Sequence, residues 1–275
     1  MHGFDHFLIT RFNLRSAKSG WNKDKRNVST LSDDWMEHRI ALFQKYCFPS
    51  IIKQSNKNFI WLIYLDVTTA KPHRQQLEKL TNIQHPEIKL IYVDGYDKFL
   101  EQHPKDVLAF RQKINDYIIT SRVDNDDLLH EDYIARVQNE FKNQSFMAVN
   151  FIKTYNYQTF PPHKLFVNIR FSNQFISLIE KISGSLPRTC YSRGDRFWNR
   201  KGEIIQIHRG VYCMEIIHEK NLLNDLSGFP VFFEKPLAQF HLDTKARTKT
   251  ITDFLKLWKM PWKKYLFFLI KYHHF

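Results

Sequence analysis

The stretch YIITSRVDNDDLLHEDYI, residues 117–134, joins an apolar run to a group of acidic residues. The run over 117–123 is nearly continuous in apolar and β-forming residues, as in a strand that is covered on both faces. Asp124, Asn125, Asp126 and Asp127 follow directly. Three carboxylates in four positions repel each other and gain nothing from a core, so a positive partner is needed to explain them.

Four other short runs are equally rich in β-forming residues: FLITRF (7–12), FIWLIYL (59–65), IKLIYV (88–93) and FMAVNFI (146–152). With the run at 117, the later starts fall at residues 59, 88, 117 and 146, a constant interval of 29 residues. That interval accommodates a strand, a helix and the turns between them. We therefore expect an α/β fold with a Rossmann-like, mainly parallel sheet and helices on both faces.

The segments between and after these runs carry further patterns. Residues 33–51 have apolar residues at helical spacing, with Ser32 placed to cap the first turn. A second helix is predicted from the four-residue spacing of Leu129, Tyr133, Val137 and Phe141. Later in the chain, residues 164–171 alternate like a strand, and residues 173–182 (NQFISLIEKI) are predicted to form a short helix.

Composition narrows the class of protein. The chain has 275 residues, enough for a large core, and its 41 Lys and Arg against 28 Asp and Glu give a net charge of +13. This excess indicates an anionic partner (nucleic acid, a phosphorylated small molecule or anionic lipid), or simply a lysine-rich, soluble surface. Three cysteines without metal-binding spacing predict reduced thiols in a cytoplasmic protein, and neither a signal peptide nor a membrane-spanning run is evident.

The acidic residues fall where a parallel sheet binds its ligands, at the carboxyl end of a strand. Carboxylates at positions i and i+2 of a tight turn can hold Mg²⁺ or Mn²⁺ together with substrate phosphates. A helix cap would need only one or two aspartates. An EF-hand is disfavoured, because the sixth position lacks glycine and a strand precedes the loop. We therefore expect a cation that carries a diphosphate.

Several motifs resemble those of known glycosyltransferases. Residues 46–69 (YCFPSIIKQSNKNFIWLIYLDVTT) are similar to the first helix and second strand of the family 2 glycosyltransferases. More narrowly, LITRFNLR (8–15), Trp35, Arg39 and TSRVDNDDLLHEDYI (120–134) resemble the rhamnosyltransferase family of GT-A fold. The resemblance extends from residue 7 to about 230. It implies an enzyme that uses a nucleotide-diphosphate sugar as donor.

The resemblance also implies a metal site. Asp124 and Asp126 match the DxD pair, with Asp126 as the direct ligand and Asp124 in contact through the ribose or a water molecule. His218, in EIIHEKNLLN, matches a late histidine that completes the metal site in many GT-A enzymes. The alternative for His218 is a histidine packed and hydrogen-bonded within the fold.

Other residues are implied to bind the nucleotide. Thr10, Arg11 and Phe12 stand where the family's first strand meets it, and Asp66 matches the acidic residue that recognises the base or ribose. Arg122 either pairs with phosphate or locks the aspartate side chains in place.

The acceptor side is less sharply defined. Glu180 matches a family segment and is a candidate acceptor-binding residue or catalytic base, because an inverting transferase needs a carboxylate to take the proton of the acceptor hydroxyl. Asp195 and Glu215 are the rival candidates.

The expected organisation is one GT-A domain over residues 1–245, followed by a basic and aromatic tail over 246–275. Residues 1–152 would form the half that binds the nucleotide sugar, and 153–245 the half that binds the acceptor. The tail mixes tryptophans with lysines, which suits either an anionic membrane surface or a helix packed on the domain. The protein would then be cytoplasmic, with peripheral attachment to the inner face of the membrane.

The predicted function is metal-dependent transfer of a sugar, rhamnose by the family name, to a hydroxyl of a growing surface polysaccharide or a lipid-linked acceptor, as in lipopolysaccharide or capsule synthesis. A non-catalytic nucleotide or sugar binder and a metal-dependent nuclease are the alternatives. Nucleic acid is not expected as a partner, because mainly apolar helix and strand flank the acidic residues.

Overall fold

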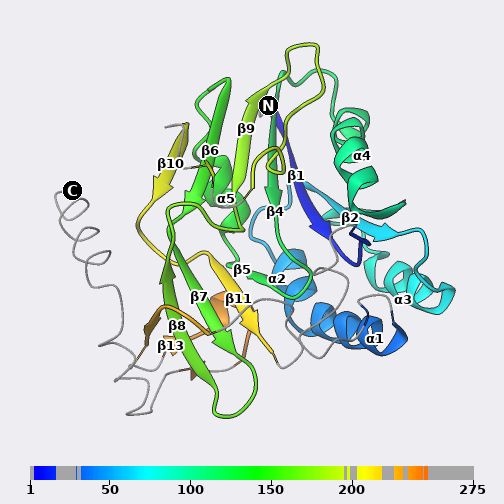
Figure 1. The fold of residues 1–275 in the computed structure, drawn as a ribbon. Coiled ribbons are helices and arrows are strands. Elements are labelled where there is room, and N and C mark those ends of the chain that lie inside the picture. Colours follow the sequence, from blue (N-terminus) through cyan, green and yellow to red (C-terminus); the bar gives the residue numbers. More distant parts are fainter. Residues whose placement is uncertain are drawn as a thin grey trace.

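The apolar runs form the strands of a seven-stranded sheet in the computed structural model, which describes residues 3–16, 29, 32–194, 197–198, 203–218, 226–231, 235–243 and 245–246 (Figure 1). All five predicted strands are present: β1 (Phe4–Arg11), β2 (Ile60–Asp66), β3 (Glu87–Val93), β4 (Tyr117–Arg122) and β6 (Phe146–Phe151). The sheet order is β10-β6-β9-β4-β1-β2-β3, and β1 to β4 run parallel. The predicted α/β class with a mainly parallel sheet is confirmed.

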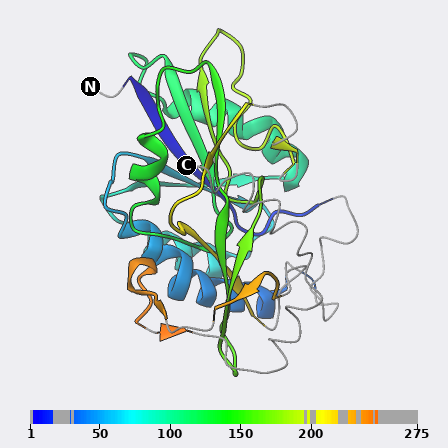
Figure 2. The same ribbon diagram turned by 90° about the vertical axis from the view of Figure 1, so that its left-hand side faces the viewer.

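Helices cover both faces of this sheet. One face packs against α1 (Asp33–Leu42), a π-helical turn (Phe43–Cys47), α2 (Phe48–Ile52), α3 (Lys71–Thr81) and α5 (Tyr133–Gln138). The other face packs against α4 (Gly95–Phe110). Figure 2 shows α5 and α4 on opposite sides of the strands. The Ser32 hydroxyl accepts a hydrogen bond from the Trp35 N–H and caps α1 as expected.

A second, five-stranded sheet has the order β12-β8-β7-β11-β5. Its strands are β5 (Leu128–Leu129), β7 (Lys153–Gln158), β8 (Lys164–Ile169), β11 (Cys213–Ile217) and β12 (Phe229–Pro230). The strand predicted over 164–171 is thus confirmed as β8. A 3₁₀ turn (Ala238–Phe240) and the pair β13 (Lys235–Pro236) and β14 (Lys245–Ala246) follow near the end of the described chain.

The short helix predicted over 173–182 is wrong. These residues form β9 (Ser177–Lys181), which lies antiparallel between β4 and β6 and hydrogen-bonds to both. Two strand edges far away in the sequence satisfy its backbone groups, and this non-local pairing outweighs the local helical pattern. Together with β10 (Ile204–Ile207), it returns the second half of the chain to the first sheet.

The helix predicted from Leu129 onward is shorter than expected. Leu129 belongs to β5, which pairs with β11, and the helix proper runs only from Tyr133 to Gln138. Pairing of β5 with β11 brings the segment after β4 against the second sheet. The residues between β4 and β5 therefore lie where the two sheets meet.

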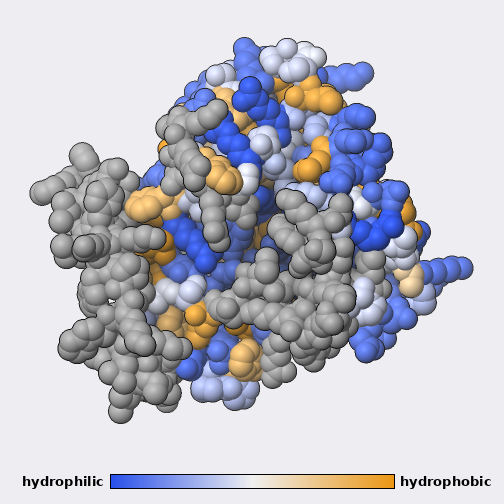
Figure 3. Space-filling model, in the orientation of Figure 1, coloured by the Kyte–Doolittle hydropathy of each residue, from blue (hydrophilic) through white to orange (hydrophobic). Residues whose placement is uncertain are grey.

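Other expectations concern the cysteines and membranes. Cys47, Cys190 and Cys213 are free and buried, consistent with the predicted thiols. Within the described ranges, no helix is long and apolar enough to cross a bilayer. Among the described residues, large exposed apolar side chains are scattered, and the coloured part of the face in Figure 3 is largely hydrophilic with separate apolar patches. The tail from residue 247 onward lies outside the described residues.

Candidate functional site

The four residues 124–127, here called the acidic loop, lie at the carboxyl edge of the parallel strands. The loop follows β4, whose Arg122 is in register with Ile9 of β1. It is tied to the end of β1, because the Asn125 side-chain amide donates a 2.7 Å hydrogen bond to the carbonyl of Phe12. The loop thus occupies the edge at which open parallel sheets bind ligands, as the sequence predicted.

Asp126 is the most enclosed acid of the DxD pair, with 6% of its surface exposed. Its Oδ2 atom forms an ion pair with Arg39 and lies 3.1 Å from Nε2 of His218. Burial by itself would raise the pKa of Asp126, but Arg39 and His218 hold it below its ordinary value. Asp126 is therefore an ionised carboxylate held in place by two cationic or dipolar partners.

His218 lies beside Asp126, so the structure brings together two of the three residues predicted to bind metal. Nδ1 of His218 is 3.4 Å from Nε2 of His38, and the two imidazole rings lie 5.2 Å apart between centroids. A chain of polar groups thus runs from α1 through His218 to the acidic loop. Whether His218 binds a metal stays a prediction.

Asp124 is the open member of the pair, with 44% of its side chain exposed. Its Oδ1 atom accepts a 3.3 Å hydrogen bond from Arg11. The Arg11 guanidinium lies over the rings of Tyr96 and Tyr191, at 5.5 and 5.3 Å from their centroids. Of the three residues at the end of β1 and just after it that are predicted to meet the nucleotide, Arg11 is the one whose side chain the structure brings to the acidic loop.

Thr10 and Phe12 are placed in the core, contrary to the prediction that they contact the nucleotide. Alternation along β1 turns them to the face opposite Arg11. The Thr10 hydroxyl accepts a 2.9 Å hydrogen bond from the Trp61 indole, and the Phe12 ring packs edge-on against Phe43. Both side chains are at least 97% buried, so their roles are in packing.

Two further acids are Asp127, the last residue of the loop, and Glu215 of β11, which lies behind it. Asp127 accepts a 3.0 Å hydrogen bond from the N–H of Ile216, and the neighbouring Glu215 accepts one from the Asn156 amide. Burial is the main cause that raises the pKa of both carboxyls, and Asp126 raises the two further. Glu215 also lies 4.0 Å from Arg170. These acids are poised to hold or take a proton closer to neutral pH than ordinary carboxyls.

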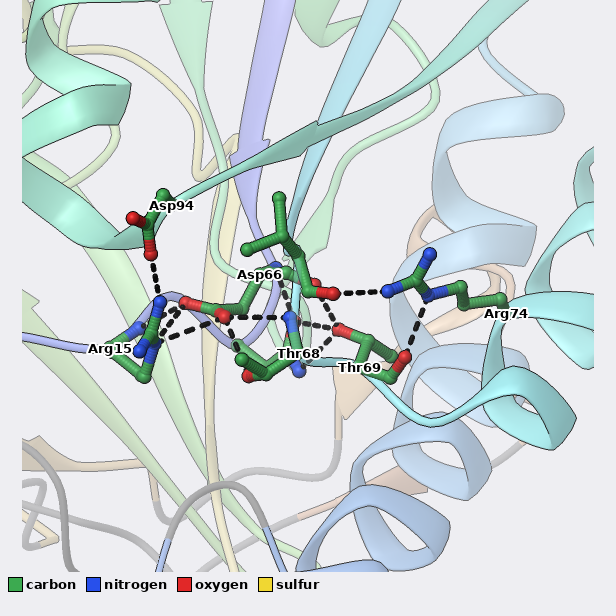
Figure 4. Close-up of polar contacts among 8 residues, drawn as sticks. Arg15, Asp66, Thr68, Thr69, Arg74 and Asp94 are labelled. Atoms are coloured by element: carbon green, nitrogen blue, oxygen red, sulfur yellow. Dashed lines mark hydrogen bonds and ion pairs between the residues drawn. The ribbon is translucent and has the colours of Figure 1, made fainter.

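Asp66 stands at the expected edge, at the end of β2, but its carboxylate is already satisfied (Figure 4). Its oxygens accept hydrogen bonds from the backbone and Nε of Arg15 and from the N–H and hydroxyl of Thr68, at 2.6 to 3.1 Å. The carboxylate has no exposed surface. Asp66 therefore positions the segment after β1, and the prediction that it contacts base or ribose is not supported by this geometry.

Arg122 anchors the segment that precedes β9. Its Nε donates a 2.7 Å hydrogen bond to the carbonyl of Gln174, and its guanidinium lies 5.4 Å from the centroid of the Tyr191 ring. The residue is 5% exposed. It lies beside the acidic loop, and its Nε and Nη2 atoms donate to the backbone carbonyls of Gln174 and Asn173, before β9.

Glu180 lies away from the acidic loop. It is in register with Ile118 near the start of β4, which at about 3.3 Å per residue places it roughly 20 Å from Asp124 along the strand. Its carboxylate accepts 2.9 Å hydrogen bonds from the backbone N–H groups of Arg188 and Thr189. The structure thus does not support Glu180 as a base at this site, because β9 carries it to the wrong end of the sheet. Asp195, the other candidate, lies outside the described residues.

The predicted cation does not fit the arrangement of the acids. In the part of the chain that the structure describes, no three His, Cys, Asp or Glu side chains converge as a metal site would require. Asp126 is already engaged by Arg39 and His218, and Asp124 by Arg11. A cation would have to displace a guanidinium that is itself buried.

Sequence reasoning missed the role of Arg39. It belongs to α1, is 6% exposed, and donates a 3.2 Å hydrogen bond to the Asn125 side chain beside its ion pair with Asp126. Its guanidinium lies 5.0 Å from the Trp35 ring centroid. The sequence does contain a signal, because Arg39 directly precedes Ile40 of the apolar row Met36, Ile40, Phe43. A charge that close to a buried helix face needs a partner of opposite charge.

Comparisons with known proteins find one matching family and several distantly similar structures. The family described as "Putative rhamnosyl transferase" matches residues 5–221. Among solved structures, S. aureus TarS 1–349 in complex with UDP aligns at 12% identity with a TM-score of 0.42, over 78% of this chain and 60% of that one. A "putative nucleotide-diphospho-sugar transferase" from Desulfovibrio desulfuricans G20 aligns at 9% identity with a TM-score of 0.38, over 78% of this chain and 81% of that one. This chain thus spans 60% of the TarS fragment. No curated protein matches the sequence.

Proposed function

The chain belongs to the "Putative rhamnosyl transferase" family, and from that premise we propose that it transfers a sugar from a nucleotide-diphosphate sugar to an acceptor hydroxyl. The observation that carries the proposal is the acidic loop at the carboxyl edge of the sheet, lined by Arg11, Arg39 and His218. Cationic groups at that edge can offset the charge that develops on a departing nucleoside diphosphate.

Among the described carboxylates, Glu215 is the best candidate for the base that takes the acceptor proton. It lies behind the acidic loop, and its raised pKa, caused first by burial, brings its proton affinity closer to that needed near neutral pH. Asp127 beside it keeps its proton more firmly, since burial, Asp126 and Glu215 all raise its pKa. Glu215 thus replaces Glu180 in this role, and Asp195 stays an untested candidate.

The finer predictions are kept as proposals. The sugar would be rhamnose by the family name, and the acceptor a surface glycan or a lipid-linked glycan. The basic tail would hold the protein at an anionic membrane surface. The predicted dependence on Mn²⁺ or Mg²⁺ is not part of this proposal, because the described acids do not fit a cation.

The experiment is a screen of UDP-, GDP- and dTDP-sugars against the full chain, read first as thermal stabilisation and then as release of nucleoside diphosphate. We expect one donor to stabilise the protein and to be turned over. Stabilisation without turnover, with every acceptor class offered, would favour the alternative of a non-catalytic binder. No stabilisation by any donor would contradict the proposal.

Two variants then test the base. Glu215→Gln should lower transfer to the acceptor by about 100-fold, the usual contribution of a general base, while leaving donor affinity unchanged. Glu180→Gln is the matched control, because it makes the same chemical change at the other end of the sheet and should leave transfer unaltered. The reverse order of effects would restore Glu180 as the base.

A further inference from the structure

Arg39 occupies the place that a cation would need next to Asp126. Its terminal nitrogen Nη1 forms both the ion pair with Asp126 and the hydrogen bond to Asn125. The side chain is fixed from α1 and is 7% exposed. A metal could share the same carboxylate oxygen only if this guanidinium moved away, which would leave a buried charge unpaired.

Two donors beside this ion pair lack an acceptor. Within the described residues, Nε of Arg39 and Nε1 of Trp35 are both buried without a hydrogen-bond partner. The two residues are four positions apart on α1 and therefore share a helix face. A buried N–H without an acceptor is destabilising, so two neighbouring ones point to an acceptor-rich ligand.

The charge around the acidic loop is already compensated. Arg11 faces Asp124, Arg39 faces Asp126, and Arg170 lies near Glu215. Asp127 is buried and accepts a hydrogen bond from the N–H of Ile216. A divalent cation would therefore meet an arginine at Asp124 and at Asp126, whereas an anion would meet free N–H donors. The exposed side of Asp124 leaves the loop open to solvent.

We propose that Arg39, together with the Trp35 indole N–H, binds the diphosphate of the donor and performs the charge compensation expected of a divalent cation. Guanidinium groups suit this task because their planar fork binds phosphate oxygens in pairs. Asp126 and His218 act as positioning residues that hold and orient Arg39. The inference rests on the proposed function, which it deepens by making donor binding independent of metal.

The first test measures the binding of inorganic pyrophosphate, as the probe, to the wild-type full chain. Isothermal titration calorimetry gives the affinity once in EDTA and once in Mn²⁺. Pyrophosphate carries the diphosphate without requiring knowledge of the base or sugar. We expect binding in EDTA with an affinity within about threefold of that in Mn²⁺, a difference of under 1 kcal/mol. Binding that is measurable only with Mn²⁺ would overturn the inference.

The second test removes the hydrogen-bond donors of Arg39 and Trp35. Arg39→Gln should weaken pyrophosphate binding in EDTA by about 10- to 100-fold, the worth of a hydrogen bond to a charged group. Arg39→Lys should weaken pyrophosphate binding by an intermediate factor, because it keeps the charge but loses the planar fork of the guanidinium. Trp35→Phe should weaken binding less than Arg39→Gln, because it removes a single N–H donor. The control is Arg136→Gln, which removes an arginine of α5 that pairs with Glu140 and should leave pyrophosphate binding unchanged.

Far-ultraviolet circular dichroism establishes that each variant is folded, and Trp35→Phe keeps the test valid even if Arg39→Gln does not fold. Affinities of Arg39→Gln and Trp35→Phe equal to that of Arg136→Gln would refute the site. Donor turnover separates this failure from failure of the proposed function. Turnover that needs Mn²⁺ and survives Arg39→Gln refutes only the inference. Metal-free pyrophosphate binding that Arg39→Gln abolishes supports it even where no donor is turned over.

Discussion

The carboxyl ends of β2 and β4 each present a buried aspartate, and the two are surrounded very differently. Asp66, at the end of β2, accepts bonds from Arg15 and Thr68 at both oxygens. Asp126, after β4, shares one oxygen between Arg39 and His218, and a neighbouring donor of Arg39 has no acceptor. An aspartate at this edge of the sheet can therefore have all its hydrogen-bonding partners satisfied within the protein, or lie beside a donor that is still available to a ligand.

The difference shows that a position at the carboxyl edge of the sheet does not by itself identify a functional acidic residue. Both aspartates satisfy the rule that ligands bind at the carboxyl ends of parallel strands. What separates them is the count of hydrogen-bonding groups: at Asp66 the donors and acceptors match, and at Asp126 donors remain. Substitution of each acid tests whether this distinction is functional.

The largest effect is expected for Asp126→Asn. The change leaves the Arg39 charge buried without its partner, which should lower the free energy of unfolding by about 3–5 kcal/mol. Donor turnover should be lost in the protein that remains folded, because Arg39 is no longer held. Urea unfolding and the donor-release assay measure the two effects. Asp124→Asn, at a partly exposed pair, is the control and should cost under about 1 kcal/mol.

A smaller and purely structural effect is expected for Asp66→Asn. Loss of the charged acceptor of Arg15 and Thr68 should cost about 1.5–3 kcal/mol of unfolding free energy. Turnover per folded molecule should stay the same, since the carboxylate has no exposed surface. A variant that is stable but inactive would break the comparison, because it would make Asp66 a ligand-binding residue after all.

The smallest effect concerns pH. The pKa of Asp127 lies well above its ordinary value of 3.8, chiefly because of burial. A carboxyl whose pKa is raised on folding contributes its full stability below pH 3.8 and loses it as the pH rises through the folded value. Asp127→Asn removes this loss and keeps an oxygen for the Ile216 N–H, so the variant should gain stability relative to wild type near pH 8 more than near pH 5.

Unfolding in urea at the two pH values measures the difference. An equal change at both would mean that Asp127 is ionised in the folded protein, and the acidic loop would then carry more negative charge than its arginines offset.

The sequence predicts the parallel strands well, because their apolar runs report burial on both faces and need no partner to be recognised. It also places Asp124 and Asp126 at the sheet edge. It does not predict β9, whose backbone is satisfied by two strands that lie far away in the chain. For the same reason Glu180 was placed at the site and Glu215 ranked behind it.

The ion pair of Arg39 with Asp126 is another long-range contact that local patterns cannot supply. The match of Trp35 and Arg39 to a family motif indicated that they matter without indicating why. Thr10 and Phe12 show the opposite error, since adjacency to Arg11 in the sequence suggested a shared role that strand alternation forbids.

The π-helical turn over Phe43–Cys47 changes the directions in which side chains point from α1 relative to those of α2. Such a turn inserts one residue more than the α-helical pitch allows. Each residue of an α-helix advances about 100° around the axis, so the turn resets the direction of everything that precedes it. Cys47, the last residue of the turn, donates a 3.5 Å hydrogen bond from its thiol to the carbonyl of Asp124. Arg39, in the last turn of α1 before it, contacts Asn125 and Asp126. Residues on both sides of the change in helical pitch thus bind the same loop.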